Sequence, residues 1–191
     1  MKKYVSFIVL SVFVGAMLNA QELRGLDKSP MDMAYFPDDY AHDRRFAPEK
    51  LTLNEAYIRV IYSRPAKKDR TVFGELVPYD KVWRTGANEA PEIKFYKDIT
   101  LNGKKVKAGS YALLSIPNKD SWTIILSKDV DQWGHYSYDE NKDVIRVKAT
   151  VSRLTSPVED FTIQFYGEKG AKAGEMWLAW DETLVTLPFS F

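Results

Sequence analysis

The stretch 84–89 (RTGANE) places three strongly hydrogen-bonding side chains close together in a chain that otherwise has a β-rich pattern. Arg84 carries five N–H donors in a fixed fork, Asn88 an amide, and Glu89 two acceptor oxygens. Gly86 permits a sharp turn with positive φ. Two interpretations follow from these residue types. Either a buried Arg84–Glu89 pair pins the loop to the fold, or Arg84 and Asn88 face a cleft and hold an anion or a sugar hydroxyl.

Other side chains would extend such a cleft. Arg64 in YSRP and Arg146 in VIRV would join it if their strands were neighbours, and Trp133 and Tyr136 would supply a flat stacking wall. Aromatic faces combined with bidentate polar groups suit carbohydrate binding, although the same aromatic residues also suit a core. The predicted ligand-binding residues are Arg64, Arg84, Asn88, Glu89, Trp133, Tyr136 and Arg146.

Nucleophilic and metal chemistry have weak support in the sequence. The chain has no cysteine and no Gly-x-Ser-x-Gly stretch, and His42 and His135 are its only imidazole bases. The stretch 139–143 (DENKD) has the spacing of oxygen ligands in a calcium loop, but Val144 and Val151 stand where such a loop needs Gly and Glu. We therefore predict no catalytic residue, no metal site and no cofactor.

The N-terminus has the pattern of a secretory signal peptide. Lys2 and Lys3 precede an apolar run over 4–18, and Ala20 suits the last residue before cleavage. The run is shorter than the roughly 20 residues of a membrane span, which makes an uncleaved anchor the weaker alternative. We expect residues 1–20 to be removed, and the rest to be soluble in the periplasm or outside the cell, with no membrane span.

Composition indicates one packed domain. The 191 residues are 45% hydrophobic, and 27 basic residues against 26 acidic ones give a net charge of +1. Nucleic-acid binding requires a basic excess that this chain lacks. Without cysteine no disulfide forms, so the core must stabilise the fold alone.

Stretches rich in β-branched and aromatic residues, separated by Gly, Pro, Asn and Asp, predict strands. They are 56–63, 92–101, 104–116, 121–127, 144–152, 160–167 and 175–191, the last as a hairpin. Asn102 and Gly103 predict a type I′ turn, and 117–120 (PNKD) a second turn. The pattern predicts an all-β fold, a single antiparallel β-sandwich over 51–191, after an irregular, extended lead-in over 21–50.

Several blocks of the sequence occur together in a recognisable order. They are LDKSPMDMAYFP, VIYSRP, VWRTGANEA, AGSYALLSIP, WTIILSKDVDQWGHYSYDENKDVIRV and WDETLVTLPF. From Leu26 to Phe189 the chain resembles an uncharacterised family of exported bacterial domains of unknown function. The hallmark positions that this resemblance implies are Arg64, Trp83, Arg84, Gly86, Asn88, Glu89, Trp133, Gly134 and Arg146. Asp69 and Pro91 stand where the family usually has Gly and Thr, and the resemblance supplies no activity.

Three functions remain open on the sequence alone. The first is a non-catalytic binding domain for a small polar ligand, such as a saccharide or an envelope fragment. The second is a hydrolase or isomerase that uses Glu89 with His135 or an aspartate as an acid–base pair. The third is a structural or envelope-assembly protein that meets a protein partner through a sheet edge or an aromatic face.

Overall fold

The computed structural model describes residues 23–51, 55–168 and 170–191. The predicted signal peptide lies outside the described residues. The strands are β1 (Met31–Phe36), β2 (Ile58–Ser63), β3 (Glu92–Phe95), β4 (Ile99–Leu101), β5 (Lys104–Val106), β6 (Gly109–Ile116), β7 (Ser121–Ser127), β8 (Asp143–Tyr166) and β9 (Ala173–Ser190). The helices are α1 (Tyr40–Phe46) and the 3-10 turns η1 (Pro48–Lys50) and η2 (Glu140–Lys142). Among these described residues, no helix has the length and apolar character needed to cross a membrane.

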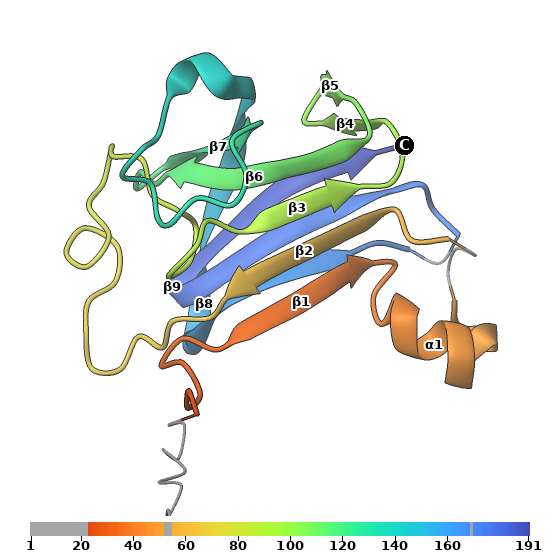
Figure 1. Ribbon diagram of the computed structural model, residues 1–191, viewed down its shortest axis with the longest axis horizontal. Coiled ribbons are helices and arrows are strands. Elements are labelled where there is room, and N and C mark those ends of the chain that lie inside the picture. The colour runs from red at the N-terminus through yellow and green to blue at the C-terminus, as the bar shows by residue number, and fades with distance from the viewer. Residues whose placement is uncertain (1–22, 52–54, 169) are drawn as a thin grey trace, which may run out of the picture.

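The strands form one antiparallel sheet in the order β1-β2-β3-β6-β7-β8-β9-β4-β5. β8 and β9 lie behind β1, β2, β3 and β6, so the sheet folds over itself into two layers (Figure 1). The register of β8 against β9 shifts between Arg153 and Val158 and again between Val158 and Thr162. Such irregularities bend a strand. The predicted all-β, sandwich-like antiparallel fold is confirmed.

The core fills the space between the layers with the alternate side chains of each strand. In β8, Val147, Ala149, Phe161, Ile163 and Phe165 are buried. The largest fully buried side chains of the described chain include Trp122, Phe95, Phe161, Ile93 and Met176. Removing this much apolar surface from water is the main stabilising contribution to a fold without disulfides.

The boundaries of several strands differ from the prediction. The stretches 144–152 and 160–166 are two parts of the single strand β8. Residues 175–190 form no hairpin but belong to the long strand β9, in which Asp181 has a φ of 53°. Turn residues in the middle of a long strand resemble those of a hairpin, because a bulge uses the same backbone conformations.

The turn at Asn102 and Gly103 is confirmed, with φ of 41° and 82°. It joins the short strands β4 and β5, whereas the predicted strand 92–101 divides into β3 and β4. β3 pairs with β6, and β4 pairs with β9. The predicted turn at 117–120 joins β6 to β7.

The lead-in has more regular structure than its sequence predicted. β1 pairs with β2 from Met31 opposite Ser63 to Phe36 opposite Ile58. α1 follows after the turn at 37–39. β1 is therefore the edge strand of the sheet. The segment before β1 contacts the long connection 64–91, which is described next.

The connection between β2 and β3 runs over 64–91 and contains no regular strand or helix. It forms the loops at the left of Figure 1, beside the segment 128–142 that joins β7 to β8. Isolated bridges hold it in place: Ala66 with Asp160, Trp83 with Ser115, and Glu89 with Trp133. A loop of this length in a compact domain is uncommon and is usually functional.

Candidate functional site

A cavity with a volume of about 620 Å³ opens beside the connection 64–91. This volume lies within the range of small-molecule sites. The lining residues suited to ligand binding are an aromatic pair, five basic residues and one histidine. They are Trp83, Trp180, Lys28, Lys68, Arg70, Lys81, Arg84 and His135.

The apolar part of the cavity is the pair Trp83 and Trp180. Their rings stack with centroids 6.0 Å apart and planes 13° apart, and both side chains are buried. The indole N–H of Trp180 donates to the Glu159 carbonyl at 3.1 Å, which fixes its orientation. Leu76 and Val77 add further apolar surface. The cavity thus offers a rigid apolar contact.

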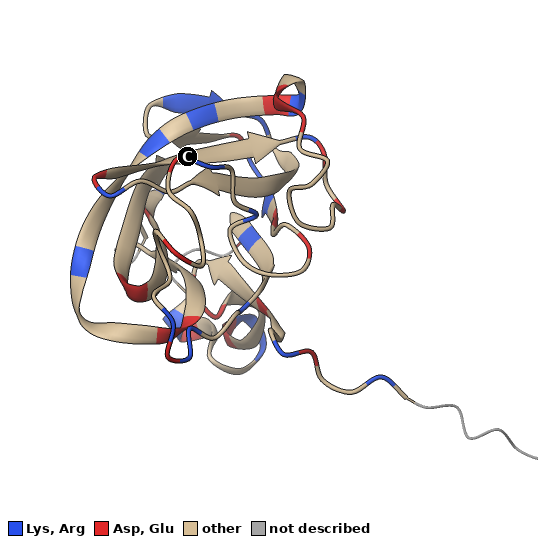
Figure 2. Cartoon of the chain, turned by 90° about the vertical axis from the view of Figure 1, so that its left-hand side faces the viewer, with Lys and Arg blue, Asp and Glu red and all other residues tan. Residues whose placement is uncertain are grey.

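The rest of the cavity is basic. Lys28, Lys68, Arg70, Lys81 and Arg84 line it, and no Asp or Glu does among the described residues. None of these five forms a salt bridge with another described residue. Figure 2 looks onto this end of the molecule, where acidic and basic segments both occur on the loops. The excess of positive charge is therefore local to the cavity.

Arg84 is the least exposed of these cations. Its Nε is buried and has no hydrogen-bond partner among the described residues, and its Nη1 lies 3.4 Å from the position a Cβ would take on Gly134. It forms no pair with Glu89, which is exposed and does not line the cavity. The predicted pinning pair is absent from the described part of the chain. Leaving a buried guanidinium N–H unpaired costs free energy, and Arg84 lines the cavity.

The backbone next to Arg84 is held in an uncommon conformation. Thr85 has φ of 54° and Gly86 of 155°. Thr85 is fully buried, and its hydroxyl donates to Ser115 Oγ at 2.9 Å. A β-branched residue at positive φ is strained, and such strain persists only where the surrounding structure imposes it. The packing of Thr85 therefore fixes the direction of Arg84.

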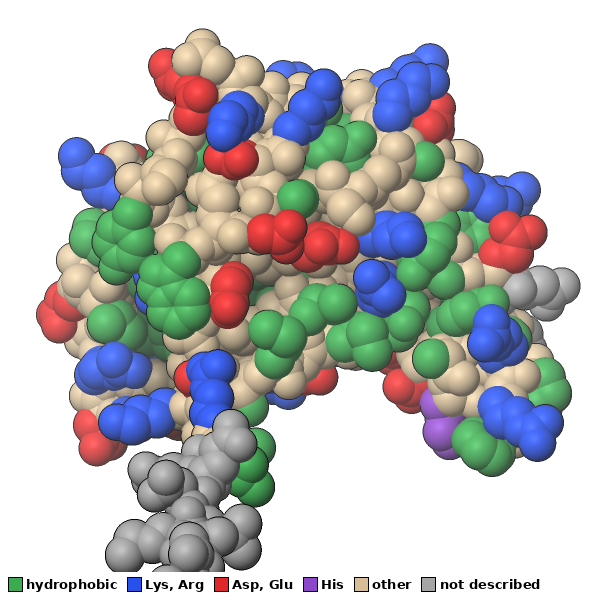
Figure 3. Space-filling view, in the orientation of Figure 1, with side chains coloured by type: hydrophobic (Ala, Val, Ile, Leu, Met, Phe, Trp, Pro, Cys, Tyr) green, Lys and Arg blue, Asp and Glu red, His purple; other side chains and the backbone are tan. Residues whose placement is uncertain are grey.

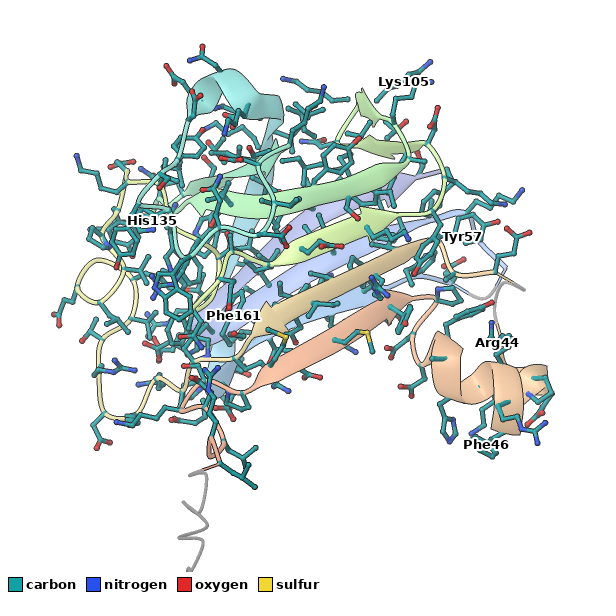
Figure 4. The ribbon with its side chains drawn as sticks, viewed as in Figure 1. Arg44, Phe46, Tyr57, Lys105, His135 and Phe161 are labelled. Atoms are coloured by element: carbon teal, nitrogen blue, oxygen red, sulfur yellow. The ribbon has the colours of Figure 1, made fainter. Side chains whose placement is uncertain are left out.

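His135 comes from the segment 128–142, which attaches to the RTGANE stretch through its backbone. The Gly134 N–H donates to the Asn88 carbonyl at 2.9 Å, and the Ala90 N–H donates to the Gln132 carbonyl at 3.0 Å. His135 Nδ1 is buried without a hydrogen-bond partner among the residues described. Burial, and secondarily the charge of Arg84, lowers the pKa of His135 below its usual 6.5. Figure 4 labels His135 at the end of the molecule that carries these loops.

Asn88 has a positioning role. Its φ is 57°, and its side-chain N–H donates to Asp27 Oδ1 at 3.0 Å. The same oxygen accepts the Ser29 N–H at 2.7 Å, and these two bonds, the Ser29 bond first, lower the pKa of Asp27. Because Asp27 is held in this way, Lys28 and Ser29 reach the cavity.

Arg64 lies outside the cavity and ties β1, β2 and β8 together. Its guanidinium donates to Asp32 Oδ2 at 2.8 Å, to the Phe161 carbonyl at 3.1 Å and to Thr162 Oγ1 at 2.8 Å. All of its nitrogens therefore have partners within the fold. The predicted role of Arg64 in a shared ligand site has no geometric support here.

Arg146 is engaged in a different network. It donates to Asp143 Oδ2 at 2.7 Å and to the Tyr138 hydroxyl at 2.6 Å, and pairs with Glu140 at 3.3 Å. Burial and the hydrogen bond with Asp143 raise the pKa of Tyr138 to about 12. These contacts attach the end of segment 128–142 to β8, and Arg146 does not line the cavity.

Trp133 and Tyr136 are both exposed, at 59% and 77%. Figure 3 shows hydrophobic side chains on the surface at the left of the view, over the end that carries the loops. Neither residue lines the cavity, but Tyr136 stacks on His135 with centroids 5.5 Å apart and planes 12° apart. Tyr136 therefore lies next to the cavity. The loops bring Arg84, Asn88, Glu89, Trp133 and Tyr136 together, and leave Arg64 and Arg146 elsewhere.

Sequence reasoning did not find most of the basic residues of the cavity. Lys68 and Arg70 belong to the run KKDR in the connection 64–91, which is the one local signal. Lys28 and Trp180 come from opposite ends of the chain, and only the fold brings them together. The described residues contain no group of three or more His, Asp or Glu side chains placed to hold a metal ion.

The comparisons with known proteins give one match. A family model described as "Protein of unknown function (DUF2911)" covers residues 47–189, which include Trp83, Arg84 and His135. No curated protein matches the chain, and no solved structure does. The expected membership of a family of unknown function is confirmed over residues 47–189, and the chain belongs to this family of proteins of unknown function.

Proposed function

We propose that this domain binds a small polar ligand, a saccharide or an envelope fragment, in the cavity beside Arg84. The observation that carries the proposal is the buried Nε of Arg84, which has no partner among the described residues and lies at a cavity of about 620 Å³. A buried donor without a partner costs free energy, and a ligand acceptor that draws the guanidinium of Arg84 toward the cavity would recover that cost. The exposed Leu76 supplies an apolar contact for the ligand body, and the buried pair Trp83 and Trp180 makes the apolar part of the lining rigid.

A binding role has better support than acid–base catalysis. The alternative of a hydrolase or isomerase needs a second titratable group that faces the same space as His135. Glu89 is exposed and does not line the cavity, and the lining contains no Asp or Glu among the described residues. The third alternative, a structural or assembly protein, would use the exposed Trp133 and Tyr136 or the edge strand β1, and it gives the cavity no role.

The test is thermal unfolding of the protein against a panel of saccharides and cell-wall fragments. A ligand at about 100 times its dissociation constant adds about 2.7 kcal/mol to the free energy of unfolding. That corresponds to a rise of roughly 5–10 °C in the midpoint for a domain of this size. The same panel is run with Arg84→Ala and with Arg153→Ala, a control whose guanidinium is 77% exposed and pairs with Glu182 away from the cavity.

The proposal predicts that one ligand class raises the midpoint of the wild type and of Arg153→Ala, and not that of folded Arg84→Ala. A panel that leaves the wild-type midpoint unchanged contradicts it. If Arg84→Ala unfolds, Lys81→Ala replaces it, because Lys81 is an exposed residue of the same cavity; its midpoint should then rise less than that of the wild type, and an equal rise contradicts the site.

We also propose that the protein acts in the periplasm or outside the cell. The basis is the signal-peptide pattern of residues 1–20. Cell fractionation followed by mass spectrometry of the N-terminus tests this. An N-terminus near residue 21 in the exported fraction supports it, and an intact chain that starts at Met1 in the cytoplasm contradicts it.

A further inference from the structure

We infer that the ligand of this cavity is acidic: a sugar-sized molecule that carries a carboxylate or a phosphate group. The inference rests on the proposed function and narrows its ligand class. Its basis is the set of basic side chains that line the cavity without a salt bridge to another described residue, together with the exposed apolar side chain of Leu76 in the same lining.

The charge balance of the cavity differs from that of the whole chain. The chain has 27 basic and 26 acidic residues, whereas Lys28, Lys68, Arg70, Lys81 and Arg84 share one cavity without an acidic lining residue among those described. Like charges that converge destabilise a fold unless they are solvated or neutralised. A group of unpaired cations around a concave space favours an anion, because the apolar wall limits solvent screening there.

The cations divide by exposure into an inner and an outer set. Arg84 is half-buried, with its Nε buried, whereas Lys28, Lys68, Arg70 and Lys81 are exposed. A guanidinium donates in parallel to both oxygens of a carboxylate or phosphate. We therefore place the acidic group at Arg84, and assign to the exposed lysines the attraction of the anion toward the cavity.

Arg70 is held in a fixed orientation. Its Nε donates to the Lys67 carbonyl at 2.9 Å and its Nη2 to the Ala66 carbonyl. These bonds order the side chain before a ligand binds, which reduces the entropy cost of binding. Arg70 thus adds a positioned positive charge to the cavity.

The ligand also needs an apolar face. Leu76 lines the cavity with 41% of its surface exposed, next to the buried lining residues Trp83, Trp180 and Val77, and a bare inorganic anion would leave Leu76 in contact with water. A sugar ring presents C–H groups on one face and hydroxyls on its edge, which suits an aromatic contact next to donors. Both features together predict an acidic saccharide in preference to a neutral saccharide or a free ion.

The experiment is isothermal titration calorimetry of the purified protein at low ionic strength with four probes. They are glucose, glucuronate, glucose 6-phosphate and inorganic phosphate, so that the ring is constant while the charged group changes. The two acidic sugars distinguish a carboxylate from a phosphate ligand. Lys81→Ala and Arg84→Gln are compared with Lys105→Ala, a control at an exposed lysine of β5 that does not line the cavity (Figure 4).

The inference predicts that an acidic sugar binds at least about tenfold more tightly than both glucose and phosphate. Arg84→Gln should weaken that binding roughly 10- to 100-fold and Lys81→Ala roughly two- to fivefold, whereas Lys105→Ala should leave it unchanged. Raising the salt concentration should weaken the binding of the acidic sugar more than that of glucose.

Three other results would overturn the inference. If glucose binds as tightly as the acidic sugars, the charge preference is wrong and the proposed binding function stands. If phosphate alone binds as tightly as the sugar phosphate, the aromatic pair has no role in recognition. If none of the four binds, the acidic-sugar assignment fails, and the saccharide panel of the thermal experiment then decides whether the binding function fails as well.

Discussion

Gly86 lies close to the backbone at the end of β2. Its φ is 155°, and a Cβ at this position would lie 3.1 Å from the Ser63 carbonyl oxygen. Gly103 also has positive φ, at 82°, but a Cβ there would meet nothing within 4 Å. A side chain would be strained by positive φ at both glycines, but only at Gly86 would it also contact a neighbouring backbone. Comparing the two positions therefore measures the cost of the close contact.

We predict that Gly86→Ala lowers the free energy of unfolding by about 1–3 kcal/mol. Gly103→Ala should cost less, because only its backbone conformation is strained. Urea denaturation of both variants measures the difference. Equal losses for the two would show that the approach to Ser63 has no energetic effect.

His135 gives the stability of the protein a specific pH dependence. Its pKa is lower in the fold than the usual 6.5, chiefly because of burial and then because of Arg84. Below about pH 6.5, His135 therefore binds a proton more readily in the unfolded chain than in the folded chain. This contribution to stability is complete above that pH and is lost as the pH falls through the folded-state pKa.

The variant His135→Gln should have a flatter dependence of stability on pH between about 7 and 5 than the wild type. Urea denaturation at several pH values tests this, with His42→Gln on α1 as the matched control for removing an imidazole. A slope for His135→Gln equal to that of the wild type would contradict the assignment of the proton to this residue.

At the scale of elements, the segment before β1 is attached to the connection 64–91 through Asp27. This carboxylate accepts hydrogen bonds from the Asn88 side chain and from the Ser29 N–H. The Asp98 carboxylate likewise accepts one from the Lys107 side chain and one from the Ala108 N–H. Asp98 lies between β3 and β4, so it offers a matched control.

We predict that Asp27→Ala releases residues 23–30 and speeds tryptic cleavage at Arg24 and Lys28, because protease access requires local opening. The midpoint of thermal unfolding should change little, because Asp27 is exposed. Asp98→Ala should leave cleavage at these two sites unchanged. Cleavage of Asp27→Ala at the wild-type rate would show that the segment is held by other contacts.

The elements that the sequence predicts best are those set by local chemistry. The Asn102–Gly103 turn follows from φ preferences, and the alternating runs of β8 around Val147 and Ile163 follow from the two-residue period of a strand. The continuity of β8 and β9 is different. It depends on pairing between residues far apart in the chain, which local residue types do not encode.

At the scale of the whole molecule, Arg64 joins the edge of the front layer to the layer behind it. Its bonds to Asp32, Phe161 and Thr162 connect β1 with β8, and the Phe161 N–H donates in return to the Pro65 carbonyl at 3.0 Å. This contact lies where β1 would otherwise be a free edge of the folded sheet.

Arg64→Ala should lower the free energy of unfolding by about 2 kcal/mol, because it removes hydrogen bonds of a charged donor and leaves their acceptors unpaired. The corresponding fall in the thermal midpoint is roughly 4–8 °C. Arg153→Ala removes an exposed ion pair with Glu182 and should cost less than about 0.5 kcal/mol. Similar losses for the two variants would argue against a connecting role for Arg64.

The site was predictable only in part, for a reason that belongs to this same scale. Arg84, Asn88 and Glu89 are close together in the sequence, so their residue types alone drew attention to the loop. Lys28 and Trp180 reach the same cavity from distant parts of the chain. Arg64 and Arg146 show the converse, because residues suited to a ligand are instead bonded within the fold.

Lys28 and Ser29 line the cavity, whereas the family match begins at residue 47. A recombinant protein trimmed to the matched boundaries would lack this part of the wall, the edge strand β1 and the Asp32 partner of Arg64. In a ligand screen, such a fragment would bind weakly or not at all because part of the cavity wall is missing, whatever the full-length protein binds. Cloning for crystallisation or screening should therefore start upstream of Leu23.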